Sequence, residues 1–113
     1  PHPFSEADML PVSSALLTPG RVERRSIQAP GLQALFLVGD DERSRTWLRQ
    51  RVDSLQALGA VGLVVNVNTA EGLARLRDLA PGLTLSPASG DDLAQRLDIR
   101  HYPVLITATG IEQ

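Results

Sequence analysis

A proline at the start of a buried strand constrains the fold of this chain more than any other feature. Pro103 precedes the apolar run 104–107, and a short helical pattern over residues 91–97 stands just before it. A proline can begin a strand, but it cannot donate a backbone hydrogen bond within it. The cis form of an X-Pro bond is accessible, and in folded proteins it is usually a structural fixture. We therefore expect a cis bond between Tyr102 and Pro103, followed directly by a strand.

The chain contains no cysteine. This absence excludes disulfides, thiol nucleophiles and zinc sites with cysteine ligands. The two histidines, His2 and His101, lie far apart in the sequence and lack the ligand spacing of a zinc site. We therefore predict no metal site, no cofactor and no catalytic thiol.

Composition narrows the classes of partner. The 113 residues are 42% apolar and 21% charged, which is typical of one globular domain, and the formal net charge is −2. The only local basic cluster is Arg21, Arg24 and Arg25, which is too small to indicate a nucleic-acid surface. No apolar run approaches the roughly 18 residues that would cross a bilayer. We predict no nucleic-acid partner and no membrane insertion of this chain.

Residues 1–31 are weakly patterned and rich in proline, and we predict an N-terminal extension that packs on the domain formed by residues 32–113. Within it the sequence predicts a helical turn over 7–10 capped by Ser5, a turn at 18–20 and an edge strand over 22–27. Apolar sheet faces are not left open. We expect five apolar side chains of the extension to cover part of one such face: Phe4, Met9, Leu10, Leu16 and Leu17.

From residue 32 onward, strand and helix patterns alternate, which predicts an α/β fold. The expected strands are 32–38, 61–67, 83–85 and 104–107, with a hairpin turn at 109–110. The expected helices are 42–58, one that begins after Thr69 and ends before Gly82, and one capped by Ser89 with Asp92. Trp47 lies on the apolar stripe of the first helix, so we expect it to pack in the core.

Three acids, Asp40, Asp41 and Glu42, follow the first confident strand. Acids at this place complement a helix N-terminus, and capping alone explains them. Because α/β folds place ligand sites at the carboxyl ends of strands, a metal-dependent active site is the alternative. No motif for phosphoryl transfer accompanies them, so we favour the capping interpretation.

The segment from Leu97 through Ile99 and Pro103 to Ile106 resembles the cis-proline region of thioredoxin-like proteins. The resemblance implies a three-layer α/β/α domain with a mixed sheet, in which the proline shapes a groove for extended peptides. The junction that carries the redox cysteine pair in thioredoxins reads here as residues 39–44, without cysteine. A protein-binding groove would then involve five residues: Asp40, Asp41, His101, Tyr102 and Pro103.

Residues 59–67, 85–87 and 101–113 together are similar to a family of uncharacterised integrating conjugative element proteins, and more distantly to pilus assembly proteins of F-type conjugation systems. This resemblance implies a periplasmic protein, made with a signal peptide, that works with other proteins of a type IV secretion apparatus.

The sequence therefore predicts a structural or protein-binding component of a conjugative DNA transfer apparatus that is not an enzyme. Two alternatives stay open. One is a chaperone-like module that binds peptides beside Tyr102 and Pro103, and the other is a metal-dependent enzyme that uses Asp40, Asp41 and Glu42.

Overall fold

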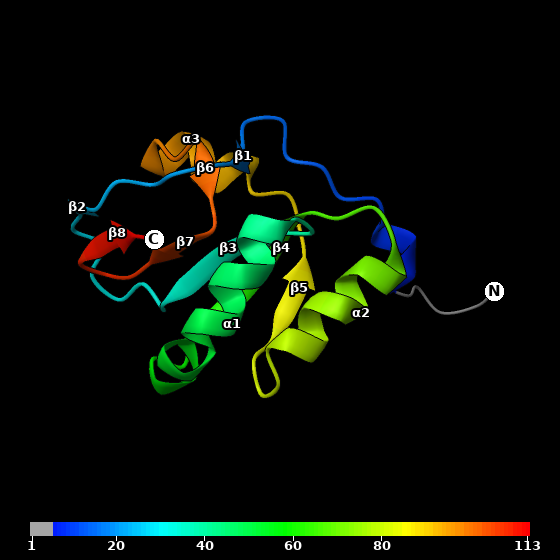
Figure 1. Ribbon diagram of the computed structural model, residues 1–113. Helices are drawn as coiled ribbons and strands as arrows, with labels where there is room; N and C mark the ends of the chain where they lie inside the picture. The colour runs from blue at the N-terminus through cyan, green and yellow to red at the C-terminus, as the bar shows by residue number, and fades with distance from the viewer. Residues whose placement is uncertain (1–5) are drawn as a thin grey trace.

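The computed structural model describes residues 6–113 and shows a mixed α/β fold (Figure 1). The helices within this range are α1 (Glu42–Ala57), α2 (Ala70–Leu79), α3 (Asp91–Leu97) and a single 3-10 turn, η1 (Glu6–Met9). The main sheet contains β2 (Arg25–Ser26), β3 (Leu35–Gly39), β4 (Val61–Asn66), β5 (Leu85–Pro87), β7 (Val104–Ile106) and β8 (Gly110–Glu112). Two further strands, β1 (Thr18–Pro19) and β6 (His101–Tyr102), pair with each other.

The main sheet has the order β2-β8-β7-β3-β4-β5. β3, β4 and β5 run parallel, whereas β7 is antiparallel to β3, and β8 and β2 continue the antiparallel half. The predicted mixed sheet is therefore confirmed. β3 lies inside the sheet and is buried along its whole length, because both of its edges are paired and both of its faces are covered.

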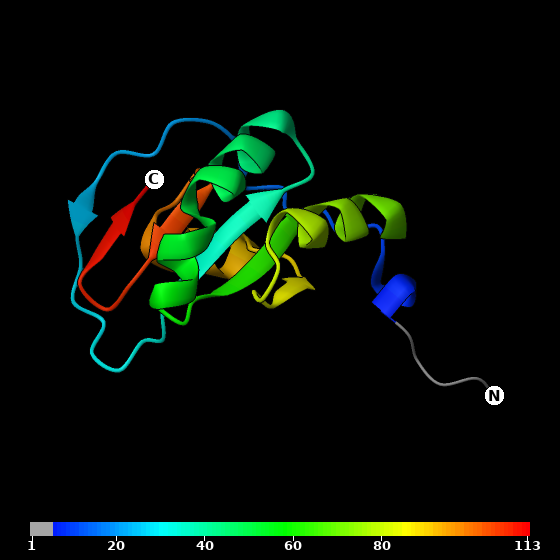
Figure 2. The same cartoon turned by 60° about the horizontal axis from the view of Figure 1, so that its bottom comes forward.

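Successive residues of β3 point to opposite faces of the sheet and join two separate cores. Phe36 and Val38 pack with residues of α1 and α2, while Leu35 and Leu37 pack with residues of α3 and the N-terminal extension. In Figure 2, α1 and α2 lie on one side of the sheet and α3 lies on the other.

The predicted first helix is confirmed to within one residue at its end. Asp41 caps α1 and accepts a hydrogen bond from the Ser44 N–H at 2.9 Å. Gly59 follows the helix with φ +63°, a conformation that favours glycine. The cap on α2 is confirmed as well, since Thr69 accepts from the Gly72 N–H at 3.0 Å.

The next strand was expected at 83–85, but β5 covers Leu85–Pro87. Leu83 donates its N–H to the Ala80 carbonyl at 3.1 Å, so residues 80–83 form the turn that follows α2. Extended pairing with β4 begins only at Leu85.

The predicted capping box on α3 is wrong. Gly90 is the N-cap residue and has no side chain to cap the helix, while the Ser89 hydroxyl accepts from the Asp91 N–H at 3.3 Å. Asp92 pairs with Arg96, and the Gly90 N–H donates to the Ser14 hydroxyl at 2.9 Å. The N-terminal extension thus contacts the residue at which α3 begins.

The extension departs furthest from the sequence predictions. Residues 18–20 do not form a turn, because Thr18 donates its N–H to the Arg100 carbonyl and Gly20 donates to the Tyr102 carbonyl, as extended chain. The expected edge strand over 22–27 shrinks to Arg25–Ser26, which pairs with β8. The expected helical turn is η1, and its predicted cap Ser5 lies outside the described residues.

The cover that the extension provides is only partly as expected. Leu17 is 2% exposed in the α3-side core, and Leu10 packs against the α1-side core. Met9 and Leu16 are 41% and 50% exposed, so their predicted role in the cover is wrong, and Phe4 lies outside the described residues. Val12, which was not predicted, is buried and forms a bridge with Val67.

Candidate functional site

The acids at the carboxyl end of β3 are held by arginines and by helix capping. Asp40 lies 2.9 Å from the Arg45 guanidinium and 3.6 Å from that of Arg75. Asp41 is the N-cap of α1 and also accepts from the Ser44 hydroxyl at 2.8 Å. Within residues 6–113, no group of three or more acids and histidines could hold a metal ion. Asp40 thus forms ion pairs and Asp41 caps a helix, and both contacts stabilise the start of α1.

Tyr102 fills the space beside this junction. Its ring is so close to Gly39 that a Cβ on residue 39 would lie 2.7 Å from ring atom Cε1. The side chain of Asn66 donates to the Tyr102 hydroxyl at 2.9 Å, and Tyr102 is only 2% exposed. The aromatic ring therefore packs on the carboxyl end of β3, and its hydroxyl is bonded to the last residue of β4.

The environment of Tyr102 keeps its phenol neutral. Burial is the main cause that raises the pKa of Tyr102, and the nearby charge of Asp41 adds to it, whereas the hydrogen bond from Asn66 acts in the opposite direction. A buried phenol with a raised pKa is neither a general base nor a nucleophile at neutral pH.

The edge of β6 that precedes Pro103 is occupied by the chain itself. The bond between Tyr102 and Pro103 is cis, and β1 pairs with His101 and Tyr102 in parallel register. The side chain of Gln113 donates to the carbonyls of both Gly20 and Pro103, at 2.8 and 2.9 Å. The N-terminal extension is thus fastened beside the proline.

The five residues of the predicted groove do not line one surface. Tyr102 is buried near Asp41, while His101 points to the other side, where its Nδ1 lies 3.1 Å from the Thr18 hydroxyl. Asp40 is engaged with arginines, and Pro103 borders a separate hollow next to α1. The strand β6 therefore separates residues that the sequence placed together.

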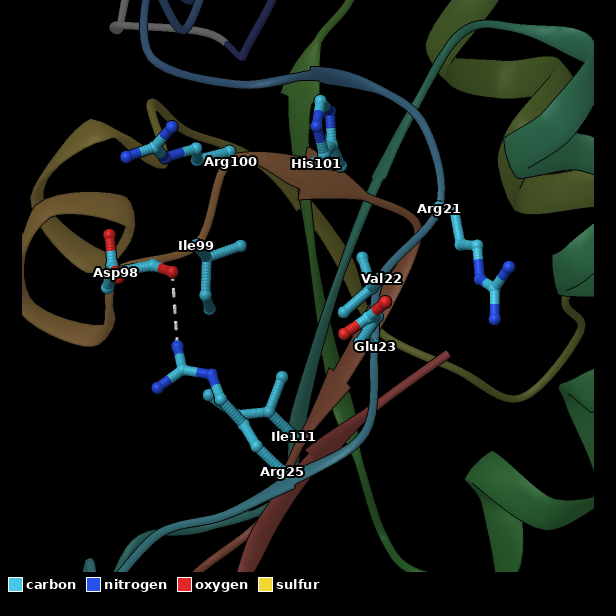
Figure 3. Close-up of a pocket in the computed structure, with 9 residues that line it drawn as sticks. All are labelled: Arg21, Val22, Glu23, Arg25, Asp98, Ile99, Arg100, His101 and Ile111. Carbon is cyan, nitrogen blue, oxygen red and sulfur yellow. Dashed lines mark hydrogen bonds between the residues drawn. The ribbon is translucent and has the colours of Figure 1, made fainter.

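One hollow, of about 350 Å³, lies between the extension and α3 (Figure 3). Val22, Ile99 and Ile111 form its apolar lining. Arg25 crosses its edge and donates to the carbonyls of Leu97 and Asp98 at the end of α3. Figure 3 shows the guanidinium groups of two further lining residues, Arg21 and Arg100, turned away from its centre. Its positive groups are thus either committed or directed elsewhere.

A second hollow, of about 490 Å³, lies between the first turns of α1 and the end of β8. Its lining consists of Glu42, Arg43, Thr46, Trp47, Gln50, Pro103 and Gln113. We call it the Trp47 hollow. The expected packing of Trp47 in the core is confirmed, since the ring is 7% exposed and lies 5.9 Å from that of Phe36.

The indole N–H of Trp47 has no hydrogen-bond acceptor among the described residues, and it is the one buried side-chain group of which this holds. The sequence marked Trp47 only as a core residue. It could not indicate the hollow, because Pro103 and Gln113 reach α1 through tertiary contacts that leave no local pattern.

Within the part of the chain that the structure describes, no helix is long and apolar enough to cross a membrane. No curated protein and no solved structure matches the chain. A family model matches residues 1–111, and its description is "Protein of unknown function (DUF2859)". The chain therefore belongs to the DUF2859 family.

Proposed function

We propose that this chain is a thioredoxin-like domain without catalytic activity that binds other proteins of a conjugative DNA transfer apparatus. The setting comes from the resemblance of residues 59–67, 85–87 and 101–113 to proteins of integrating conjugative elements. The same resemblance leads us to propose a periplasmic location and export by a signal peptide.

The order of elements supports the thioredoxin-like part of the proposal. A central strand, β3, leads into α1 and pairs in parallel with β4, and β7 returns antiparallel on its other side after a cis-proline. Helices on both faces of the sheet agree with a three-layer domain.

The single observation that carries the non-catalytic assignment is the packing of Tyr102 on Gly39 at the junction between β3 and α1. In a thioredoxin this junction holds the reactive thiols. Here the Tyr102 ring contacts Gly39, Asp40 is neutralised by Arg45, and Asp41 is committed to the helix cap. A protein whose junction lacks cysteine, and whose first two acids are committed to structural contacts, can use the fold for binding without the chemistry.

The two alternatives find less support. A chaperone-like module would need a free strand edge beside Tyr102 and Pro103, but β1 occupies that edge. A metal-dependent enzyme would need free acid ligands, but Asp40 and Glu42 pair with arginines. Addition of magnesium should leave the NMR resonances near Asp40 unchanged, and specific shifts there would revive the enzyme alternative.

The proposal is tested by deleting the gene in a donor strain and measuring the frequency of conjugative transfer. We expect transfer to fall and to be restored by the wild-type gene and by the Asp40→Asn variant. If the wild-type gene restored transfer but a correctly folded Asp40→Asn protein did not, the result would favour the metal-dependent enzyme. Normal transfer without the gene would refute the proposed function.

A further inference from the structure

Trp47, which lines the Trp47 hollow, carries an uncommitted donor in a place where proteins rarely leave one. Most buried polar side-chain atoms have a hydrogen-bond partner, so each exception needs an explanation. The Trp47 indole N–H is buried and has no acceptor within residues 6–113. The ring borders an open surface hollow of about 490 Å³.

The charges around the hollow are not balanced. The Glu42 carboxylate lies 3.4 Å from the Arg45 guanidinium and 3.8 Å from that of Arg49, so its charge is compensated. Arg43 is exposed and has no ion pair within the described part of the chain. The hollow therefore presents one free guanidinium, and the ring that carries the unpaired N–H forms part of its wall. Both groups are complementary to an anionic oxygen.

The remaining walls suit a polypeptide. Gln50 and Gln113 supply amide groups, Thr46 a hydroxyl, and Pro103 an apolar surface. Gln113 is held in place because its amide bonds to Gly20 and Pro103 and its main-chain carbonyl accepts from Arg51. This wall is thus already formed before any partner arrives.

We propose that the Trp47 hollow docks an acidic segment of a partner polypeptide, with a carboxylate between Arg43 and the Trp47 indole N–H. The nitrogen is shielded from solvent, so docking requires the ring to turn toward the hollow. This inference rests on the proposed function, because it names the chemistry by which the domain recognises another protein.

The sole tryptophan gives a direct measurement, since the chain has one indole N–H and therefore one indole resonance. The full chain, labelled with ¹⁵N, is titrated with an octapeptide of alternating glutamate and leucine, and separately with one of alternating lysine and leucine. We expect the glutamate peptide to move the indole resonance downfield and the lysine peptide to leave it in place. An indole resonance that ignores the glutamate peptide, or that moves equally with both peptides, would overturn the proposal.

Two variants separate docking from non-specific attraction. Trp47→Phe keeps an aromatic ring and removes the donor, and we expect binding to weaken about tenfold or more, read from the backbone amide of Gln50. Arg43→Glu should abolish the preference for the glutamate peptide. The matched control Arg96→Glu changes an exposed arginine on α3 and should leave the affinity unchanged. A control that weakens binding as much as Arg43→Glu would also contradict the proposal.

The donor strain distinguishes the two levels of failure. If deletion of the gene stops transfer but Arg43→Glu supports it fully and the peptide does not bind, the docking proposal is wrong and the proposed function stands. If deletion has no effect on transfer, the proposed function itself is wrong, whatever the peptide does.

Discussion

The ring of Tyr102 lies against the backbone of Gly39 so closely that residue 39 has no room for a side chain. A Cβ there would meet ring atom Cε1 at 2.7 Å and the hydroxyl oxygen at 2.9 Å. Gly39 ends the central strand, and Tyr102 stands directly before the cis-proline. The contact therefore joins the end of the central strand to the residue before the cis-proline.

Gly39→Ala should destabilise the protein by about 1–3 kcal/mol, the usual cost of adding an atom to a packed interior. Gly39 does not have a positive φ, so the cost is steric and the ring of Tyr102 causes it. Urea unfolding of a double-mutant cycle with Tyr102→Leu checks this. We expect Gly39→Ala to destabilise the Tyr102→Leu protein much less than the wild type. An equal destabilisation in both proteins would show that the Tyr102 ring is not responsible.

The stability of the protein should fall as the pH rises above about 10, the ordinary pKa of tyrosine. Burial raises the pKa of Tyr102 in the folded protein. Between pH 10 and this raised pKa, the native state keeps a proton that the unfolded state has lost, so the free energy of unfolding falls as the pH rises. Below pH 10 the contribution is fully present. Tyr102 is the only tyrosine, and the chain lacks both lysine and cysteine. Few other side chains therefore titrate in this pH range and contribute to the change in stability.

Urea unfolding at about pH 9 and about pH 11 measures this change, with Tyr102→Phe as the control that should remove it. The ultraviolet absorbance of the phenolate gives the folded pKa directly. A phenol that ionises at or below its ordinary value would contradict the burial described here.

The strands and helices from residue 32 onward could be predicted because their signals are local. Asp41 and Thr69 cap the helices that they were expected to cap, and β4 ends one residue before its predicted end. β3 begins three residues later than the predicted strand 32–38, because Leu32 still donates to the Ala29 carbonyl in a turn. The error at Ser89 has the opposite origin. Gly90 and not Ser89 is the N-cap, and the Gly90 N–H donates to the hydroxyl of Ser14, which is 76 residues away in the sequence. A distant contact of this kind leaves no periodic pattern.

The candidate site was harder to predict than the fold for the same reason. Tyr102 and Asp41 do lie near each other, as the groove prediction required. His101 does not, because neighbouring residues in a strand point to opposite faces. The edge of β6 is filled by Thr18 and Pro19, which the sequence presents as a turn. Only the tertiary structure reveals that the extension pairs with β6 beside Pro103.

Leu17→Ala should cost about 2–5 kcal/mol of stability, the range for a fully buried leucine. Leu17 is 2% exposed, and Gly90 lies so close to it that a Cβ there would be 2.7 Å from the leucine Cδ1. The neighbouring Leu16 is 50% exposed and serves as the control, with an expected change within about 0.5 kcal/mol. Equal effects of the two substitutions on urea unfolding would mean that the extension is not anchored through Leu17.

Ser14→Ala should destabilise the protein by about 1–3 kcal/mol, although it removes only one oxygen atom. The Ser14 hydroxyl donates to the Val65 carbonyl at 2.7 Å and accepts from the Gly90 N–H at 2.9 Å, and the residue is 4% exposed. Without it, the Gly90 N–H at the start of α3 loses its partner in a place that water does not reach. Leaving a buried donor unpaired costs more than the bond itself was worth.

Hydrogen exchange identifies the mechanism of this loss, because the Gly90 amide should exchange faster in Ser14→Ala by more than the global destabilisation explains. Ser13→Ala, one residue away and exposed, is the matched control and should change neither the stability nor the exchange. A Ser14→Ala protein as stable as the wild type would show that the Ser14 hydroxyl does not stabilise the start of α3.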